Sequence, residues 1–251
     1  MNERRTPRLL TALACAAVVL STTGCSVVEE ALHSALEALD EPAVATDSDA
    51  NDGFAETDTA LLDQLATIEV KGRAPKTGYE RDEFGSGWLD PDRNGCDARN
   101  DMLRRDLTEV TFKDGTQDCV VLTGTLDDAF TGTVIEFQRG PGSSSEVQID
   151  HLVALSDAWQ KGAQQLSDQE RELFANDPLN LLAVDGGTNA AKGDSDAATW
   201  LPPNGGFWCD YVARQTAVKA KYDLWMTAAE HRAVAEVVTS RCPDAKALAI
   251  S

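Results

Sequence analysis

The sequence predicts an α+β fold for one folded domain, residues 66–251. Short segments rich in β-branched residues predict strands, and two patterns of Ser or Thr followed three residues later by Glu predict capped helix starts. About 186 residues are enough for one domain with a real core and too few for two. We therefore expect a small β-sheet surrounded by helices.

The first part of this domain alternates between strand, loop and helix signals. Residues 68–71 predict a short strand, and residues 75–94, rich in Gly, aromatic and charged residues, predict an ordered loop. Residues 97–107 have apolar side chains on a helical period, which predicts a short helix starting near Cys96. Residues 120–122 and 134–137 have the β-branched content of strands, and a turn-rich segment joins them.

The second part carries the strands and helices around the polar motifs. Residues 146–149 alternate polar and apolar side chains, so Asp150 and His151 should lie at a strand end. Residues 152–161 and 167–174 predict helices, the second with a capping box at Ser167 and Glu170. We then expect a strand at residues 179–184, a turn at 185–187 and a short helix at 188–193, capped by Thr188. Two closing helices are expected at residues 208–225 and 227–238.

The N-terminus has the pattern of a lipoprotein signal peptide, residues 1–24. Three Arg precede a run of about a dozen apolar residues, too short to span a bilayer, where roughly 20 are needed. Cys25 directly after Gly24 resembles a bacterial lipobox, with Thr22 where Leu is usual. We expect Cys25 to be acylated and to anchor an exported protein to the outer face of the membrane. Ordinary signal cleavage, with Cys25 a spare thiol or the protein shed, is the alternative.

An acidic segment follows, residues 25–65, and predicts a solvated, disordered tether. It holds eleven acidic residues and no Lys or Arg. The formal net charge is -20, and removing the signal's three Arg and one Glu and the tether's eleven acids leaves 19 basic and 30 acidic residues. This charge argues against tight, metal-free binding of nucleic acid. Screening over roughly 8 Å makes a local basic patch decisive, and the main candidates are Arg99, Arg104 and Arg105.

Four of the six cysteines belong to the folded part, since Cys15 lies in the signal and Cys25 in the lipobox. An even number in an exported protein predicts two disulfides. Proximity in sequence favours one of the three possible connectivities, and no CxxC pair supports the rival zinc site. The favoured pairs are Cys96 with Cys119 and Cys209 with Cys242.

Asp150, His151, Asn180 and Asn189 form the motif that indicates chemistry. A carboxylate, an imidazole and a carboxamide at these intervals can hold one divalent metal beside a general base, as phosphodiester cleavage requires. Residues 146–193 also have the predicted order strand, insertion, strand, turn and helix. With Ile-Asp-His, Asn-Leu-Leu and Asn-x-x-Lys, this order resembles the HNH (ββα-metal, His-Me finger) nucleases. The run from residue 79 to 238 resembles exported actinobacterial members with the C-terminal domain of GmrSD-type modification-dependent restriction enzymes.

The resemblance implies a role for each motif residue. His151 would be the general base that activates water, and Asp150 a carboxylate ligand of the metal. Asn189 would be the second ligand, in the place of the last His of the family name. Asn180 would hold the loop between the strands and help to orient His151, and Lys192 would contact phosphate. Apart from the resemblance, Arg99, Arg104 and Arg105 form either a solvated helix face or a site that docks phosphates.

The chemistry of these side chains supports the same roles. A neutral imidazole can accept a proton from water near neutral pH. Asp and Asn oxygens are hard ligands, so Mg²⁺ suits the site best, Mn²⁺ is acceptable and Zn²⁺ is less suitable. We expect a monomeric endonuclease that prefers DNA to RNA. Its sequence preference should be low, since the chain shows no separate recognition module. A surface-anchored binding lipoprotein on an inactive nuclease scaffold is the alternative, and a toxin with an immunity protein is a third.

Overall fold

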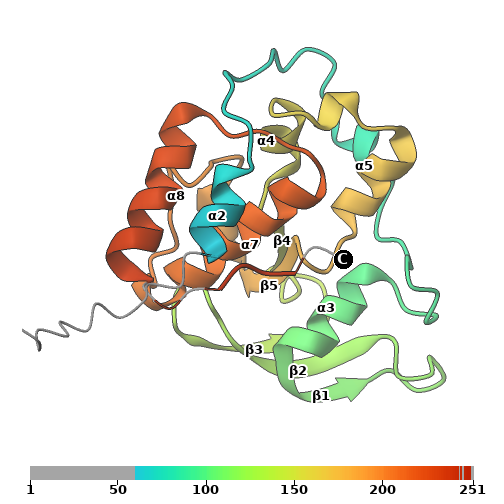
Figure 1. Cartoon of the computed structure of the whole chain (residues 1–251). Coiled ribbons are helices and arrows are strands. Elements are labelled where there is room, and N and C mark those ends of the chain that lie inside the picture. The colour runs from blue at the N-terminus through green and yellow to red at the C-terminus, as the bar shows by residue number, and fades with distance from the viewer. Residues whose placement is uncertain (1–59, 243, 245, 250–251) are drawn as a thin grey trace, which may run out of the picture. The chain divides into compact units, whose positions relative to one another are not determined.

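The computed structural model describes residues 60–242, 244 and 246–249. The signal peptide, Cys25 and most of the expected tether lie outside these residues. The described part has the predicted α+β architecture, with two small antiparallel sheets among helices (Figure 1). One sheet has the strand order β1-β2-β3, and the other consists of β4 and β5. No helix in this part is long and apolar enough to cross a bilayer.

The elements occur in the order helices, first sheet, second sheet and closing helices. Three helical segments precede the strands: α2 (Ala60–Ala66), η2 (Arg81–Phe84) and α3 (Ala98–Asp106). The strands are β1 (Leu107–Phe112), β2 (Val121–Asp127), β3 (Val134–Gln138), β4 (Val147–His151) and β5 (Leu181–Asp185). Between β4 and β5 lie α4 (Leu155–Trp159), η3 (Ala163–Gln165) and α5 (Asp168–Ala175). After β5 come α6 (Gly186–Lys192), η4 (Gly205–Phe207), α7 (Trp208–Lys221) and α8 (Ala228–Arg241).

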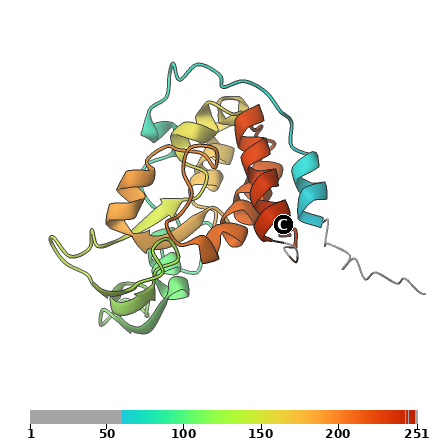
Figure 2. The ribbon, with the colours of Figure 1, turned by 90° about the vertical axis from the view of Figure 1, so that its left-hand side faces the viewer.

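Helix α2 corrects the predicted end of the tether, because residues 60–65 belong to the folded domain. Leu61 and Leu65 are 0% and 1% exposed, in one apolar cluster with Tyr211 and Val234. The helix lies against α7 and α8 (Figure 2). Leu61 and Leu65 are four residues apart and share one helix face, so their burial stabilises a helix in an otherwise acidic segment.

Several other boundaries differ from the predictions. The expected strand at 68–71 is only a single bridge between Val70 and Met226. Helix α3 ends at Asp106, and the following residues form β1, a strand that the sequence did not indicate. Both capping boxes are confirmed, in α5 and in α8. Helix α6 starts earlier than expected, because the side chain of Asp185, and not Thr188, caps it by accepting from the Thr188 amide.

The β4–β5 hairpin is buried on both faces. In β5, Leu181 and Ala183 pack with α3 and the first sheet, while Leu182 and Val184 pack with α7. This alternation is the two-residue period of a strand. In β4, Val147 and Ile149 join the former cluster, so Gln148 and Asp150 face the other side. The register places Asp150 opposite Leu182.

Gly186 allows α6 to begin directly after β5. A Cβ atom at this position would lie 1.9 Å from the carbonyl oxygen of Ser145, so no other residue fits there without a shift of the backbone. The Gly186 amide donates to the carbonyl oxygen of Glu146, one residue before β4. The close approach ties the start of α6 to the start of β4.

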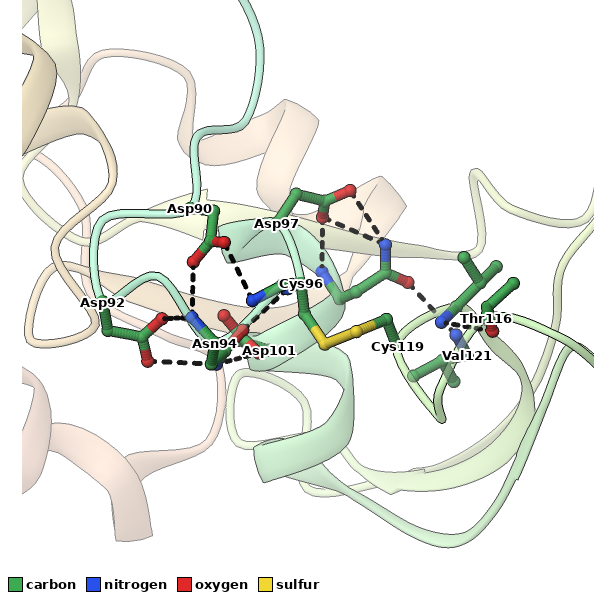
Figure 3. The surroundings of a disulfide bond; sticks show 12 residues. Asp90, Asp92, Asn94, Cys96, Asp97, Asp101, Thr116, Cys119 and Val121 are labelled. Atoms are coloured by element: carbon green, nitrogen blue, oxygen red, sulfur yellow. Dashed lines mark hydrogen bonds between the residues drawn. A yellow bond between two sulfur atoms is a disulfide. The ribbon is translucent and has the colours of Figure 1, made fainter.

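The two predicted disulfides are confirmed. Cys96–Cys119 joins the start of α3 to the segment before β2, and Cys209–Cys242 joins the start of α7 to the end of α8. Figure 3 shows the first bridge with Asp97 and Val121 nearby. The side-chain oxygen of Asn100, in α3, accepts from the Val121 amide at 3.1 Å. The covalent link and this hydrogen bond both attach α3 to β2.

A buried ion network connects the helices behind the hairpin. Lys161 bonds to Asp157 at 2.7 Å, Asp196 at 2.8 Å and Glu230 at 2.5 Å. Burial alone would lower the pKa of Lys161, but the charges of Asp157 and Glu230 raise it above its usual value, so the ammonium group stays protonated. The network joins α4, α7, α8 and the segment after α6, and its members are Arg73, Asp157, Lys161, Asp196, Lys219 and Glu230.

Replacing Lys161 with Met should destabilise the domain. Three buried carboxylates would then share only Lys219 and Arg73, and breaking a buried ion pair from one side costs about 3–5 kcal/mol. Urea unfolding at neutral pH measures the change. The control is Lys113→Met at an exposed position, which should alter the free energy of unfolding by less than about 0.5 kcal/mol. Equal stability of the two variants would contradict the network's contribution.

Candidate active site

His151 ends β4 as a buried, neutral imidazole. Its Nε2 atom lies 2.8 Å from the carbonyl oxygen of Ala175, and its ring stacks on Trp88 with 5.8 Å between centroids. Burial is the main cause that lowers the pKa of His151, to about 4, against the hydrogen bond to Ala175, which raises it. A carbonyl oxygen can only accept, so Nε2 carries the proton. The Nδ1 atom therefore keeps its lone pair at neutral pH.

Asp150 is a buried carboxylate with one oxygen bound and one oxygen free. Its Oδ1 atom accepts from the Lys192 ammonium group at 2.9 Å. Its Oδ2 atom is buried and has no hydrogen-bond partner among the described residues. Burial raises the pKa of Asp150, and the charge of Lys192 opposes this shift. A buried, unpaired carboxylate oxygen is costly, so Oδ2 indicates a position for a cation or a hydrogen-bond donor.

Lys192 has a different position from the predicted contact with phosphate. Its side chain is 0% exposed, and its ammonium group donates to Asp150 and to the carbonyl oxygen of His151 at 2.8 Å. Helix α6 starts at Gly186, so Lys192 falls on the face that packs on β4. The ammonium group therefore holds Asp150 and the end of β4, and it does not face solvent.

Asn180 closes the long excursion between β4 and β5. Its side-chain oxygen accepts from the Val153 amide at 2.8 Å, and its side-chain nitrogen donates to the Val153 carbonyl oxygen at 3.3 Å. Its own carbonyl oxygen accepts from the Leu152 amide at 2.8 Å. These are hydrogen bonds of the kind predicted from the sequence. They fix the two residues that follow His151.

An open cleft of about 350 Å³ brings the motif residues together. Asp150, His151 and Asn189 all line it. Asn189 comes from α6, and its side-chain nitrogen donates to Gln148 at 3.0 Å. The same cleft is lined by Tyr79, Arg81, Ser156 and Asp194. A carboxylate, an imidazole and a carboxamide from β4 and α6 thus share one solvent-accessible space.

The three arginines of α3 do not line this cleft. Arg105 donates to the carbonyl oxygens of Pro178 and Leu181, each at 2.8 Å. Arg99 donates to the carbonyl oxygen of Val147 at 3.3 Å, and Arg104 lies over the ring of Phe112. These groups have structural partners, and their predicted contact with substrate receives no support from the geometry.

Arg81 is one of the cleft residues that the sequence did not indicate. It lies in the segment predicted as an ordered loop, where charged residues are common, and no spacing relates it to Asp150. Only the path of the chain before α3 brings it beside His151.

Comparison with known proteins places these residues in a family. The family model of GmrSD restriction endonucleases, C-terminal domain, matches residues 97–237, which include Asp150, His151, Asn180, Asn189 and Lys192. The chain belongs to this family. The resemblance predicted from the motifs is therefore confirmed.

An uncharacterized secreted protein of Arthroderma benhamiae is 35% identical over 178 residues, which cover 70% of this chain and 82% of that protein. No solved structure matches the chain. This relative is described as secreted, and the present chain has two disulfides. Both observations fit an exported protein.

The donors in the cleft fit a small, hard cation. The Oδ2 atom of Asp150 has no hydrogen-bond partner in the described part of the chain, and the carboxamide oxygen of Asn189 is a further hard ligand. Among the described residues, no three or more His, Cys, Asp or Glu side chains are grouped so that they could hold a metal ion. A metal at this site would therefore rest on two protein ligands and leave the other positions to water and substrate.

The neutral state of His151 should make stability depend on pH. The folded pKa of about 4 lies below the ordinary value of about 6.5. Between these values the unfolded chain binds more protons, so stability falls as the pH falls. Between about pH 7.5 and pH 4.5, urea unfolding should show the wild type losing about 2 kcal/mol more than His151→Asn, which lacks the titrating group. Parallel losses would place the pKa of His151 near its ordinary value.

Proposed function

We propose that this chain is an exported, lipid-anchored endonuclease that hydrolyses phosphodiester bonds in DNA with a divalent metal ion, best Mg²⁺. The observation that carries the proposal is the shared cleft. It joins a neutral imidazole, a buried carboxylate oxygen without a partner and the Asn189 carboxamide. Membership of a nuclease family supports the same reaction class.

His151 acts as the general base in this proposal. Its Nδ1 atom takes a proton from a water molecule in the cleft as that water attacks phosphorus. The Ala175 carbonyl oxygen and the Trp88 ring hold the imidazole in one orientation, so little motion is needed before the proton moves. Asn180 supports the chain directly after the base.

Asp150 and Asn189 would hold the metal ion through their side-chain oxygens. A bound ion would supply positive charge to stabilise the phosphate and the leaving oxygen. The charge of Lys192 opposes the rise that burial causes in the pKa of Asp150 and so favours the ionised carboxylate, a hard anionic ligand. In this proposal the protein is a monomer that cleaves DNA with little sequence preference.

One observation favours the alternative, a binding lipoprotein on an inactive nuclease scaffold. Lys192 already compensates the charge of Asp150 without a metal ion. Such a protein would bind its ligand equally well in the presence of a chelator and would not cleave nucleic acid.

Cleavage of DNA tests the choice between the two functions. Purified protein with Mg²⁺ or Mn²⁺ should nick plasmid and lose activity with EDTA. His151→Ala should lower kcat by about 10²–10⁴-fold, the usual contribution of a general base. His231→Ala, the matched change at the other His of the described residues, should keep full activity. Single-stranded DNA and RNA are run in parallel. If His151→Ala and the wild type cleave equally, the assigned base is wrong.

The lipid anchor is a separate part of the proposal and rests on Gly24 and Cys25, which lie outside the described residues. Cys25→Ser, expressed from the full-length gene in a bacterial host, should move the protein from the membrane fraction to the medium or the soluble extracytoplasmic fraction. Metabolic labelling with an alkyne fatty acid should mark the wild type and not the variant. Cys15→Ser is the matched control, and it should keep both label and membrane association. If the wild type carries no label, Cys25 is not acylated and the proposed lipid anchor is wrong.

A further inference from the structure

We propose that Arg81 binds a phosphate group of the nucleic-acid substrate in the cleft. The inference rests on the proposed function and deepens it, because it assigns the substrate contact to the segment before α3. The arginines of α3 would then have only structural roles.

Arg81 lies where two hollows meet beside the general base. It lines the cleft with Asp150, His151 and Asn189, and it also lines a second hollow with Trp88 and Ala175. His151 also lines both spaces. A phosphate beside the imidazole would therefore come within reach of the Arg81 side chain.

Arg81 is also the one Lys or Arg among the described residues that line the cleft. Its side chain is exposed, and no ion pair or hydrogen bond involves it in the described part of the chain. By contrast, Arg73 pairs with Asp157 and Asp196, and Arg214 donates to three carbonyl oxygens. The guanidinium group of Arg81 can therefore bind a ligand without first breaking a contact.

The backbone that carries Arg81 is firmly anchored. Arg81 begins η2, and Phe84 at the other end of η2 is buried against Phe174 and Trp159. The carbonyl oxygen of Glu83 accepts from Arg171 at 2.7 Å. Because the backbone is already fixed, only the side chain of Arg81 loses conformational freedom when it binds a phosphate.

The chemistry of the group selects phosphate. A guanidinium group presents paired donors that match two phosphate oxygens. The neighbours Glu80, Asp82 and Glu83 are acidic, and Asp194 at the cleft already pairs with Lys76 at 3.2 Å. In this acidic protein, Arg81 therefore provides a positive charge beside the general base, where a phosphate of the substrate can bind. The positive charge of Arg81 also acts on His151 and adds to the lowering of its pKa.

A binding assay without cleavage tests this inference. A fluorescein-labelled DNA oligonucleotide is titrated with His151→Ala protein in Mg²⁺, and the Kd is followed by anisotropy. Adding Arg81→Ala should weaken binding by about 10- to 100-fold, the usual value of a charge-assisted contact. It should also reduce the slope of log Kd against log salt by about 1. Arg81→Lys should recover part of the affinity. The matched control is Arg232→Ala on α8, outside the cleft, which should change Kd by less than about 2-fold.

The possible results separate the two proposals. If wild-type protein cleaves DNA while Arg81→Ala binds as tightly as the Arg232→Ala control, the Arg81 assignment fails and the nuclease proposal stands. A loss caused by Arg104→Ala and not by Arg81→Ala would place the substrate along α3 and would also overturn it. If the wild type neither binds nor cleaves DNA or RNA, both proposals fail. Urea unfolding of each variant confirms that it is folded.

Discussion

The contact between the Lys192 ammonium group and Asp150 is the interaction on which the candidate site depends. A carboxylate inside a domain is tolerated only with a counter-charge, and Lys192 supplies it from α6. The same ammonium group binds the carbonyl oxygen of His151. One side chain therefore favours the ionised form of Asp150, fixes the end of β4 and sets the orientation of α6. Asn189 reaches the cleft because it lies three residues before Lys192 on that helix.

The domain buries several of its lysines in ion pairs with carboxylates. Lys161, Lys219 and Lys192 are all buried against carboxylates, so they add nothing to the external positive potential. The surface attraction is then local, at the cleft. An acidic protein can bind a nucleic acid in this way if a metal ion and an unpaired arginine contact the phosphate, since distant charges are screened.

The long segment between β4 and β5 serves to orient His151. Asn180, at the end of this segment, accepts a hydrogen bond from the Val153 amide at its beginning. Near the end of the segment, the carbonyl oxygen of Ala175 accepts a hydrogen bond from His151. The buried ion network then holds α4 in place through Asp157. His151, the proposed base, is therefore oriented by residues from the insertion that follows it, while the proposed metal ligands come from β4 and α6.

Local patterns in the sequence were sufficient for the features that depend on neighbouring residues. They predicted the capping boxes, the β4–β5–α6 order, the two disulfides and the Asp150–His151 position at a strand end, because each follows from short-range hydrogen bonding, strand periodicity or spacing. Strand β1 and helix α2 escaped prediction, since β1 is stabilised by pairing with β2 and α2 by packing on α7 and α8. The sequence also did not predict which way individual side chains point. Lys192 turned inward to a buried carboxylate, and Arg81 came to the cleft from a loop about 70 residues away. Such placements depend on contacts between distant segments, and only the packed tertiary structure determines them.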